Sequence, residues 1–288
     1  MSLNSEKISH LMDRVYNGYS VSEVKTVGKS WFSRDISVSA IGHGSKNVLI
    51  VGGFGGRDVF ISSFLADFSH ELDEKLYSKG RISDFNISAL CGKSRIHIIP
   101  MLNPDGIILN NLGILPENPF YGRVSGIMRG STDFNKWDAN IRGVSLYGNF
   151  NKNWIKMKLS ERSKGIFMNS PSGYFGEYPE SELEVSSLCS FSRMLIPDIV
   201  FELRLLNNNC IIPIETVENK HKINAVSRVI CEYTNIKAVE DEGFGNGSFA
   251  SWSEGEFNCL SFIMGITEEL TPENASALKN AILLATAL

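Results

Sequence analysis

Short, almost wholly apolar runs recur along this chain, and each is bounded by glycine, proline or polar residues. Strands buried on both faces of a sheet have this continuous pattern, because neither face is left for polar side chains. We therefore predict central strands at residues 47–52, 95–100, 197–203, 210–214 and 259–266.

Apolar positions that repeat with helical spacing lie between these runs. They predict helices over residues 59–76, 180–194 and 219–233, and a last helix that runs to the C-terminus. The last helix has a clear start, because Thr271 is a suitable N-cap and Pro272 fits the first turn. Strands that alternate with helices predict a three-layer α/β architecture.

Residues 110–175 are rich in glycine and asparagine and have only weak periodicity, which predicts a long looped insertion. Long loops in such folds usually build the functional site. The chain has no internal repeat, low-complexity tract or Pro/Ser-rich linker, so we expect one domain over residues 1–288.

Composition and charge indicate which classes of binding partner to expect. Hydrophobic residues make up 43% and charged residues 21%, as in ordinary soluble globular proteins. The formal net charge of -4 with scattered lysines and arginines gives no reason to expect nucleic acid. No apolar run is long enough to span a bilayer and no secretory signal is visible, so we expect no membrane partner and a cytoplasmic location. The oligomeric state is left open.

The cysteines give no sign of a disulfide or zinc framework. They are odd in number, widely spaced and without a Cys-x-x-Cys pair, at positions 91, 189, 210, 231 and 259. We expect small buried apolar side chains in a reducing compartment.

Six motifs carry a family resemblance. Residues 98–106 (Ile-Ile-Pro-Met-Leu-Asn-Pro-Asp-Gly) are close to P-x-x-N-P-D-G, and residues 137–150 (Trp-Asp-Ala-Asn-Ile-Arg-Gly-Val-Ser-Leu-Tyr-Gly-Asn-Phe) resemble W-R-x-N-x-x-G-V-D-L-N-R-N-F. The other four motifs lie at residues 27–36, 48–58 and 177–182, and at 247–252 together with 260–262. In content and order they resemble the zinc carboxypeptidase family. The resemblance implies an α/β/α fold around a mixed, mostly parallel twisted sheet.

The resemblance also identifies the positions of the metal ligands. Relatives bind zinc through a His-x-x-Glu motif and a later histidine, and keep an open position for water. Here the His-x-x-Glu positions hold Gly55 and Asp58, and the later histidine is replaced by Arg204. Glycine offers no ligand atom, and a guanidinium stays protonated and repels a divalent cation. We therefore expect no metal and no other cofactor.

The remaining family positions are substituted as well. Asp138 replaces the arginine that stabilises the oxyanion, which reverses the charge at that position. Tyr147 and Gly148 replace the Asn-Arg pair that holds the substrate carboxylate, and Gly265 replaces the general-base glutamate. Residues 242–246, in the loop that bears a tyrosine in relatives, contain none. No catalytic residue of the family is intact.

This coordinated loss favours a binding or regulatory protein that is catalytically inactive and binds a peptide, a cell-wall fragment or another small ligand. The candidate ligand-binding residues are Arg57, Asp58, Asn140, Arg142, Tyr147 and Arg204. For Asn140 and Arg142 the other interpretation is structural, because buried polar side chains usually hold loops in place.

The alternative is an active metallo-carboxypeptidase or amidase with displaced ligands, in which zinc would be present. Glu268, three residues after Gly265, is its weak candidate for the general base, although a carboxylate in a loop is more often solvated. A hydrolase that uses other chemistry on the same scaffold stays open, because fold does not fix function.

Two local hypotheses concern pairs of residues. Asp58 and Arg204 both project toward the metal position of relatives, where they either form an ion pair or lie apart in an open, wet cleft. His70 and Asp73 have helical spacing, and we expect them on the solvated face of a helix rather than in a metal site.

Overall fold

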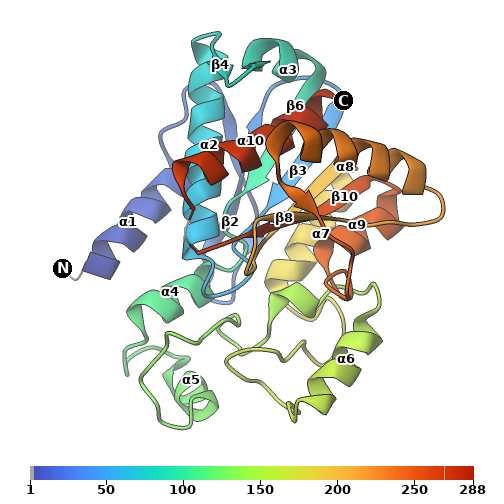
Figure 1. Cartoon of the computed structure of the whole chain (residues 1–288). Helices are drawn as coiled ribbons and strands as arrows, with labels where there is room; N and C mark the ends of the chain where they lie inside the picture. The colour runs from blue at the N-terminus through green and yellow to red at the C-terminus, as the bar shows by residue number, and fades with distance from the viewer. Residues whose placement is uncertain (1–2, 269) are drawn as a thin grey trace.

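The computed structural model describes residues 3–268 and 270–288, and these form a helix-covered sheet (Figure 1). The sheet has eight strands in the order β1-β2-β6-β3-β7-β10-β8-β9. In that order the strands are Glu23–Lys29, Asp35–Ile41, Ser94–Ile99, Lys46–Val51, Ile199–Leu205, Leu260–Ile266, Cys210–Pro213 and Lys237–Ala238. A separate hairpin joins β4 (Arg81–Ile82) and β5 (Phe85–Asn86).

The four central strands, β6, β3, β7 and β10, run parallel, whereas β2 and β8 pair antiparallel to them. This confirms the expected mixed, mostly parallel sheet. The five apolar runs form β3, β6, β7, β8 and β10, each within two residues of the predicted bounds. Their central side chains are buried, as the continuous apolar pattern requires.

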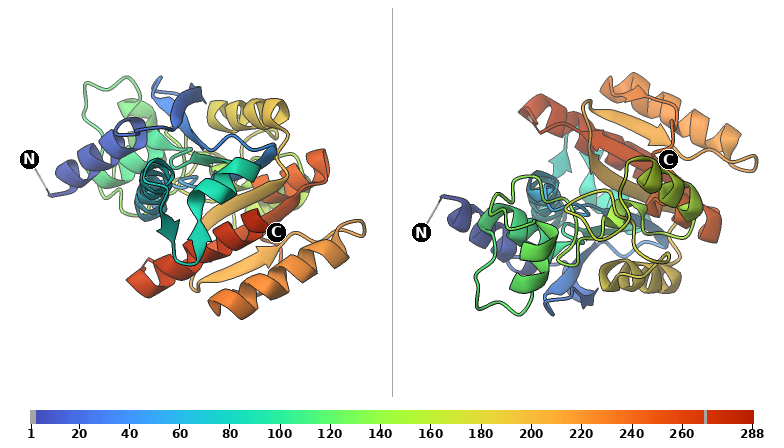
Figure 2. Two further views of the ribbon diagram at one scale, coloured as in Figure 1. Left: turned by 90° about the horizontal axis from the view of Figure 1, so that it is seen from above. Right: turned by 90° about the horizontal axis from the view of Figure 1, so that it is seen from below.

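Helices cover both faces of the sheet (Figures 1 and 2). One face packs against α2 (Val59–Tyr77), α3 (Ile87–Lys93), α8 (Lys220–Thr234) and α10 (Pro272–Ala287). The opposite face packs against α7 (Leu183–Leu195) and α9 (Phe249–Phe257). At one side of the molecule, α1 (Leu3–Tyr16) contacts α2 and α4 (Pro104–Leu112).

Helix starts follow from local chemistry. The Thr271 hydroxyl accepts a hydrogen bond from the backbone N–H of Asn274 at 3.2 Å, so this residue caps α10 as predicted. The helix expected from residue 180 begins instead at Leu183. Glu180 has a left-handed φ of 59° and Glu182 is extended, and neither conformation continues a helix.

Segment 110–175 lies at the carboxyl ends of the parallel strands, at the bottom of Figure 1. It contains α5 (Tyr121–Ile127), the 3-10 turn η1 (Leu146–Gly148) and α6 (Trp154–Ser163), and is otherwise irregular. Backbone hydrogen bonds join distant parts of this segment, such as the bond from the Asp138 N–H to the Pro171 carbonyl at 2.8 Å.

All five cysteines are free thiols, and four of them are buried, as the sequence predicts; Cys231 is partly exposed. None of the helices in the described part of the chain has the length and apolar character needed to cross a bilayer.

The expectation that His70 and Asp73 lie on a solvated helix face is wrong. Asp73 is buried, and its carboxylate accepts the backbone N–H groups of Ser20, Val21 and Ser22 at 2.6, 3.1 and 2.7 Å. His70 stacks on Tyr19, with ring centroids 4.3 Å apart. Asp73 and His70 therefore hold the segment between α1 and β1 against α2. The Asp73 carboxylate also satisfies three backbone N–H groups that need an acceptor when they are removed from water.

We predict that Asp73→Asn lowers the free energy of unfolding by about 1.5–3 kcal/mol, because charge-assisted hydrogen bonds to buried donors are lost. The matched control is Asp67→Asn on the same helix, which breaks only an exposed ion pair with Arg14 and should cost less than about 1 kcal/mol. Urea denaturation measures both. Equal losses would contradict the anchoring role of Asp73.

Candidate functional site

The family positions substituted in this sequence converge at the carboxyl ends of the central strands. Asp58 stands at the start of α2, after the loop that follows β3. Arg204 lies near the end of β7 and is the parallel-register partner of Gly265 on β10. Segment 137–150 brings Asp138 and Tyr147 to the same place. Ligand sites of open α/β sheets usually lie at this end of the strands.

The space beside Gly55 is taken by a carboxylate. A Cβ atom on Gly55 would lie 2.2 Å from Asp138 Oδ1 and 3.3 Å from Asp58 Oδ1. Asp138 therefore occupies the room that a side chain at the first family ligand position needs, and it accepts the backbone N–H of Arg57 at 3.4 Å. The two substitutions fit each other, since glycine at position 55 makes room for the carboxylate.

Asp58 is committed to partners within the protein. Its carboxylate accepts the Gly55 backbone N–H at 2.8 Å and the Tyr147 hydroxyl, and the residue is only 1% exposed. Burial raises the pKa of Asp58 well above its usual range, and the nearby Asp138 carboxylate raises it further. Tyr147 stacks on Phe54, with ring centroids 5.0 Å apart, and burial likewise raises its pKa.

Arg204 pairs with a residue of its own strand. Its Nε donates to Glu202 Oε1 at 2.5 Å, and the other Glu202 oxygen accepts the Ala250 backbone N–H at 2.8 Å. The guanidinium lies over the Tyr147 ring, 4.8 Å from its centroid. The expected Asp58–Arg204 ion pair is therefore not formed, because Tyr147 stands between the two groups. The open-cleft alternative is also wrong, because Asp58 is buried.

Gly265 leaves no room for a glutamate side chain. A Cβ atom there would lie 2.7 Å from Cys210 Sγ and 2.8 Å from the Asn208 carbonyl oxygen. Glu268, the weak alternative to the lost base, instead forms an ion pair with Arg57 at 2.6 Å, with side chains 66% and 47% exposed. This ion pair lies at the surface, so Glu268 does not take the place of the general base beside the buried carboxylates.

These residues do not fit a zinc ion. Gly55 contributes no ligand atom, the Asp58 carboxylate is hydrogen-bonded to Tyr147, and a fixed cation stands at Arg204. Across the described residues, no three His, Cys, Asp or Glu side chains are grouped in a way that could hold a metal. Catalytic zinc sites use three protein ligands, which this position lacks.

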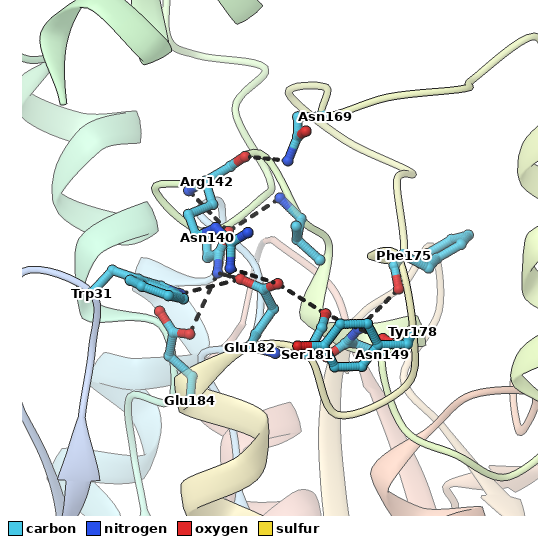
Figure 3. Close-up of polar contacts among 11 residues, drawn as sticks. Trp31, Asn140, Arg142, Asn149, Asn169, Phe175, Tyr178, Ser181, Glu182 and Glu184 are labelled. Carbon is cyan, nitrogen blue, oxygen red and sulfur yellow. Dashed lines mark hydrogen bonds and ion pairs between the residues drawn. The ribbon is translucent and has the colours of Figure 1, made fainter.

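Asn140 and Arg142 belong to a buried network that holds the insertion (Figure 3). The Asn140 amide donates to Glu182 at 2.7 Å, and its carbonyl oxygen accepts the backbone N–H groups of Arg142 and Val144 at 3.0 and 3.1 Å. The Arg142 guanidinium lies 4.4 Å from the Trp31 ring centroid. Asn140 is fully used in these contacts, which supports its structural interpretation.

Glu202 and Glu184 are the important residues that the sequence reasoning did not identify. A signal for Glu202 exists, since residues two apart on a strand share a face and Glu202 precedes Arg204 by two. Glu184 has no comparable signal, because its burial depends on how the insertion packs over the start of α7.

Glu184 is a carboxyl group held neutral by its surroundings. It is fully buried, and burial raises its pKa from the ordinary 4.5 to about 8, with a further rise from the nearby Glu182 carboxylate. The folded protein thus keeps this proton to a higher pH than the unfolded chain. The resulting stabilisation is complete below pH 4.5 and is lost as the pH rises through 8.

We predict that Glu184→Gln becomes more stable relative to the wild type as the pH rises from 4.5 to 8. The gain is roughly 1.4 kcal/mol for each pH unit in which only the folded state holds the proton. Chemical denaturation at a series of pH values measures it. The exposed Glu117→Gln is the matched control, and parallel stability curves for Glu184→Gln and the wild type would contradict the assignment.

We also predict that Arg204→Met lowers the free energy of unfolding by about 3–5 kcal/mol, because it leaves the buried Glu202 carboxylate without its cation. The double variant Glu202→Gln/Arg204→Met should recover much of that loss, since it removes both charges. A loss below about 0.5 kcal/mol for Arg204→Met in urea denaturation would show that the pair is not formed.

Comparison with known proteins identifies the family of this chain and supports its fold. The sequence model of the zinc carboxypeptidase family matches residues 8–212 of this chain. Gamma-D-glutamyl-L-diamino acid endopeptidase 1 of Lysinibacillus sphaericus is 24% identical over 167 residues, which are 58% of this chain and 41% of that protein. The chain therefore spans less than half the length of this relative.

Two solved structures share the fold. Bovine thrombin-activatable fibrinolysis inhibitor superposes with a TM-score of 0.65 at 17% identity, over 99% of this chain and 95% of that one. The murein-tripeptide amidase of Escherichia coli O157 gives a TM-score of 0.55 at 17% identity, over 96% and 94%. The motifs, the sheet and the matched profile agree: the chain belongs to the zinc carboxypeptidase family.

Proposed function

We propose that this protein is a non-catalytic member of its family, which binds a peptide or a cell-wall fragment without cleaving it and without a zinc cofactor. The observation that carries the proposal is the Arg204 guanidinium at a family ligand position, fixed there by Glu202 at 2.5 Å. The positive charge of Arg204 repels a zinc ion at this position, and moving the guanidinium away would break its buried ion pair with Glu202, which is costly.

The other substitutions remove each remaining step of metal-assisted hydrolysis. Asp138 places negative charge where the tetrahedral intermediate needs positive charge. Gly265 cannot take up a proton, and the backbone beside it excludes a larger residue. Gly148 has no side chain to hold a substrate carboxylate, and the Phe175 ring packs against Gly148. Together these changes close the route that relatives use.

The names of the relatives support the ligand class. One is an endopeptidase for gamma-D-glutamyl-L-diamino acid links and another an amidase for murein tripeptide. Of the six candidate binding residues, Arg57 has the most open side chain, and it lies at the rim of the site. The free cysteines support a reducing compartment, and we place the protein in the cytoplasm on that basis.

Metal analysis of the purified protein after exposure to zinc, combined with hydrolysis assays, tests the proposal. We expect substoichiometric zinc, and no cleavage of C-terminal peptide bonds or of gamma-D-glutamyl-diamino acid peptides. The comparison variant is Gly55→His/Asp138→Arg/Arg204→His, which restores two ligands beside Asp58 and removes the carboxylate that fills the space. It should bind zinc more tightly than the unmodified chain.

Two results would overturn the proposal. The first is tight, stoichiometric zinc in the unmodified chain together with peptide cleavage, which would establish the active metallo-hydrolase. The second is metal-independent cleavage that purified Arg204→Met lacks, which would establish other chemistry at this position.

A further inference from the structure

A cavity of about 830 Å³ opens in the insertion, away from the substituted family site. Its walls are α5 with the residues that follow it and segment 165–171. Its volume lies within the range of small-ligand sites, about 300–1,000 Å³. None of the side chains at the substituted zinc position, such as Asp58, Asp138 and Arg204, lines it.

The charge lining the cavity is mostly positive. Arg123, Arg129 and Lys136 are exposed, and no described acidic side chain lies within ion-pair distance of any of them. The one acidic residue in the lining, Asp133, accepts the backbone N–H of Asn135 at 3.1 Å. The three cations are therefore available to an anionic ligand.

This positive charge contrasts with the rest of the protein. Residues 110–175 hold nine of the 28 lysines and arginines but only four of the 32 aspartates and glutamates, in a chain of net charge -4. A positive region on an acidic protein attracts anions and raises their local concentration.

Apolar side chains stand beside the cations. Phe167 and Met168 are 71% and 72% exposed, and both line the cavity together with Ile127 and Met128. Large side chains that are exposed together at a cavity often mark a binding site. A ligand that matches this lining has carboxylates and at least one apolar side chain.

The backbone at Arg129 makes this position suitable for a test by substitution. This residue follows α5 with a left-handed φ of 52°, next to Gly130 at 79°. Glycine is the preferred residue for that conformation after a helix, whereas a side chain makes it less favourable. Local stability alone therefore favours glycine at position 129, so Arg129→Gly can remove the charge without destabilising the fold.

The cavity wall is joined to the substituted site. Asp138 N–H donates to the Pro171 carbonyl at 2.8 Å, and the Asn169 side chain donates to the Arg142 carbonyl at 2.7 Å. Segment 165–171 is thus held by the same residues, 137–150, that carry the family motif. The cavity wall is thus fixed to the family motif, although no side chain of the substituted site lines the cavity.

We propose that this cavity is a ligand site separate from the substituted family site and that it binds an acidic peptide, with carboxylates on Arg123, Arg129 and Lys136 and an apolar side chain on Phe167 and Met168. The inference rests on the proposed non-catalytic function only in that the peptide is bound and not cleaved.

The test is binding to a panel of acetylated pentapeptides with two or three glutamates and otherwise apolar residues, measured by titration calorimetry on the full chain. The matched panel has glutamine in place of glutamate. We expect binding of acidic peptides that weakens with added salt, and no binding of the glutamine panel. Arg129→Gly should weaken binding by about tenfold or more, as for the loss of one charge-assisted contact.

Arg129→Gly also separates ligand binding from folding, because it should melt at or above the wild-type temperature while it loses affinity. Lys156→Gln is the matched control, since Lys156 is an exposed cation of the same insertion outside the cavity, and its affinity should stay within about twofold of the wild type.

Three outcomes of the peptide titration would overturn this site. They are equal binding of the two panels, no binding of either, or loss of affinity in Lys156→Gln equal to that in Arg129→Gly. Arg129-dependent binding to phosphatidylglycerol vesicles without peptide binding would also overturn it, in favour of a membrane surface. None of these results bears on zinc content or hydrolysis, so the proposed function is judged separately.

Discussion

The ion pair between Glu202 and Arg204 lies within the sheet, on the strand that the other site residues surround. Both charges are largely removed from water, so each requires the other, and breaking such a pair costs about 3–5 kcal/mol. The Glu202 carboxylate also receives the Ala250 N–H, which links β7 to α9. With the guanidinium fixed in this way, Tyr147 packs beneath it and its hydroxyl reaches Asp58. The substitutions therefore form one arrangement, in which protein side chains satisfy one another where relatives hold a metal.

The family fold itself rests on contacts outside this charge pair. The sheet, its helices and the buried network around Asn140 make no use of a metal. Gly55 and Asp138 fit each other, since the absence of a side chain at position 55 leaves the space that the Asp138 carboxylate occupies. Removal of a metal site without such compensation would leave buried polar groups unpaired, which is costly.

Much of the fold could be predicted from the sequence, because buried parallel strands leave continuous apolar runs and the cap of α10 is a local signal. The site was predictable as a set of substituted positions but not as a set of contacts. The alternation along β7 places Glu202 beside Arg204, yet the position of Tyr147 between Arg204 and Asp58 depends on the irregular insertion. Asp73 was misjudged for the same kind of reason, since its three backbone partners come from a distant loop. Long-range packing of irregular chain leaves no periodic pattern to detect.

The protein combines a set of mutually paired side chains at the family's metal-ligand positions with an open, positively lined cavity in the insertion. Arg204 and Tyr147 pair with Glu202 and Asp58 at the family's metal-ligand positions. A crystal structure of the protein grown in the presence of zinc, with anomalous data at the zinc edge, would show whether this pairing excludes the metal. We predict that Arg204 contacts Glu202, that Tyr147 contacts Asp58, and that no anomalous peak lies between them. A zinc peak on Asp58, with Arg204 turned away from Glu202, would show that the metal position is open and that the pairing described here is not the stable arrangement.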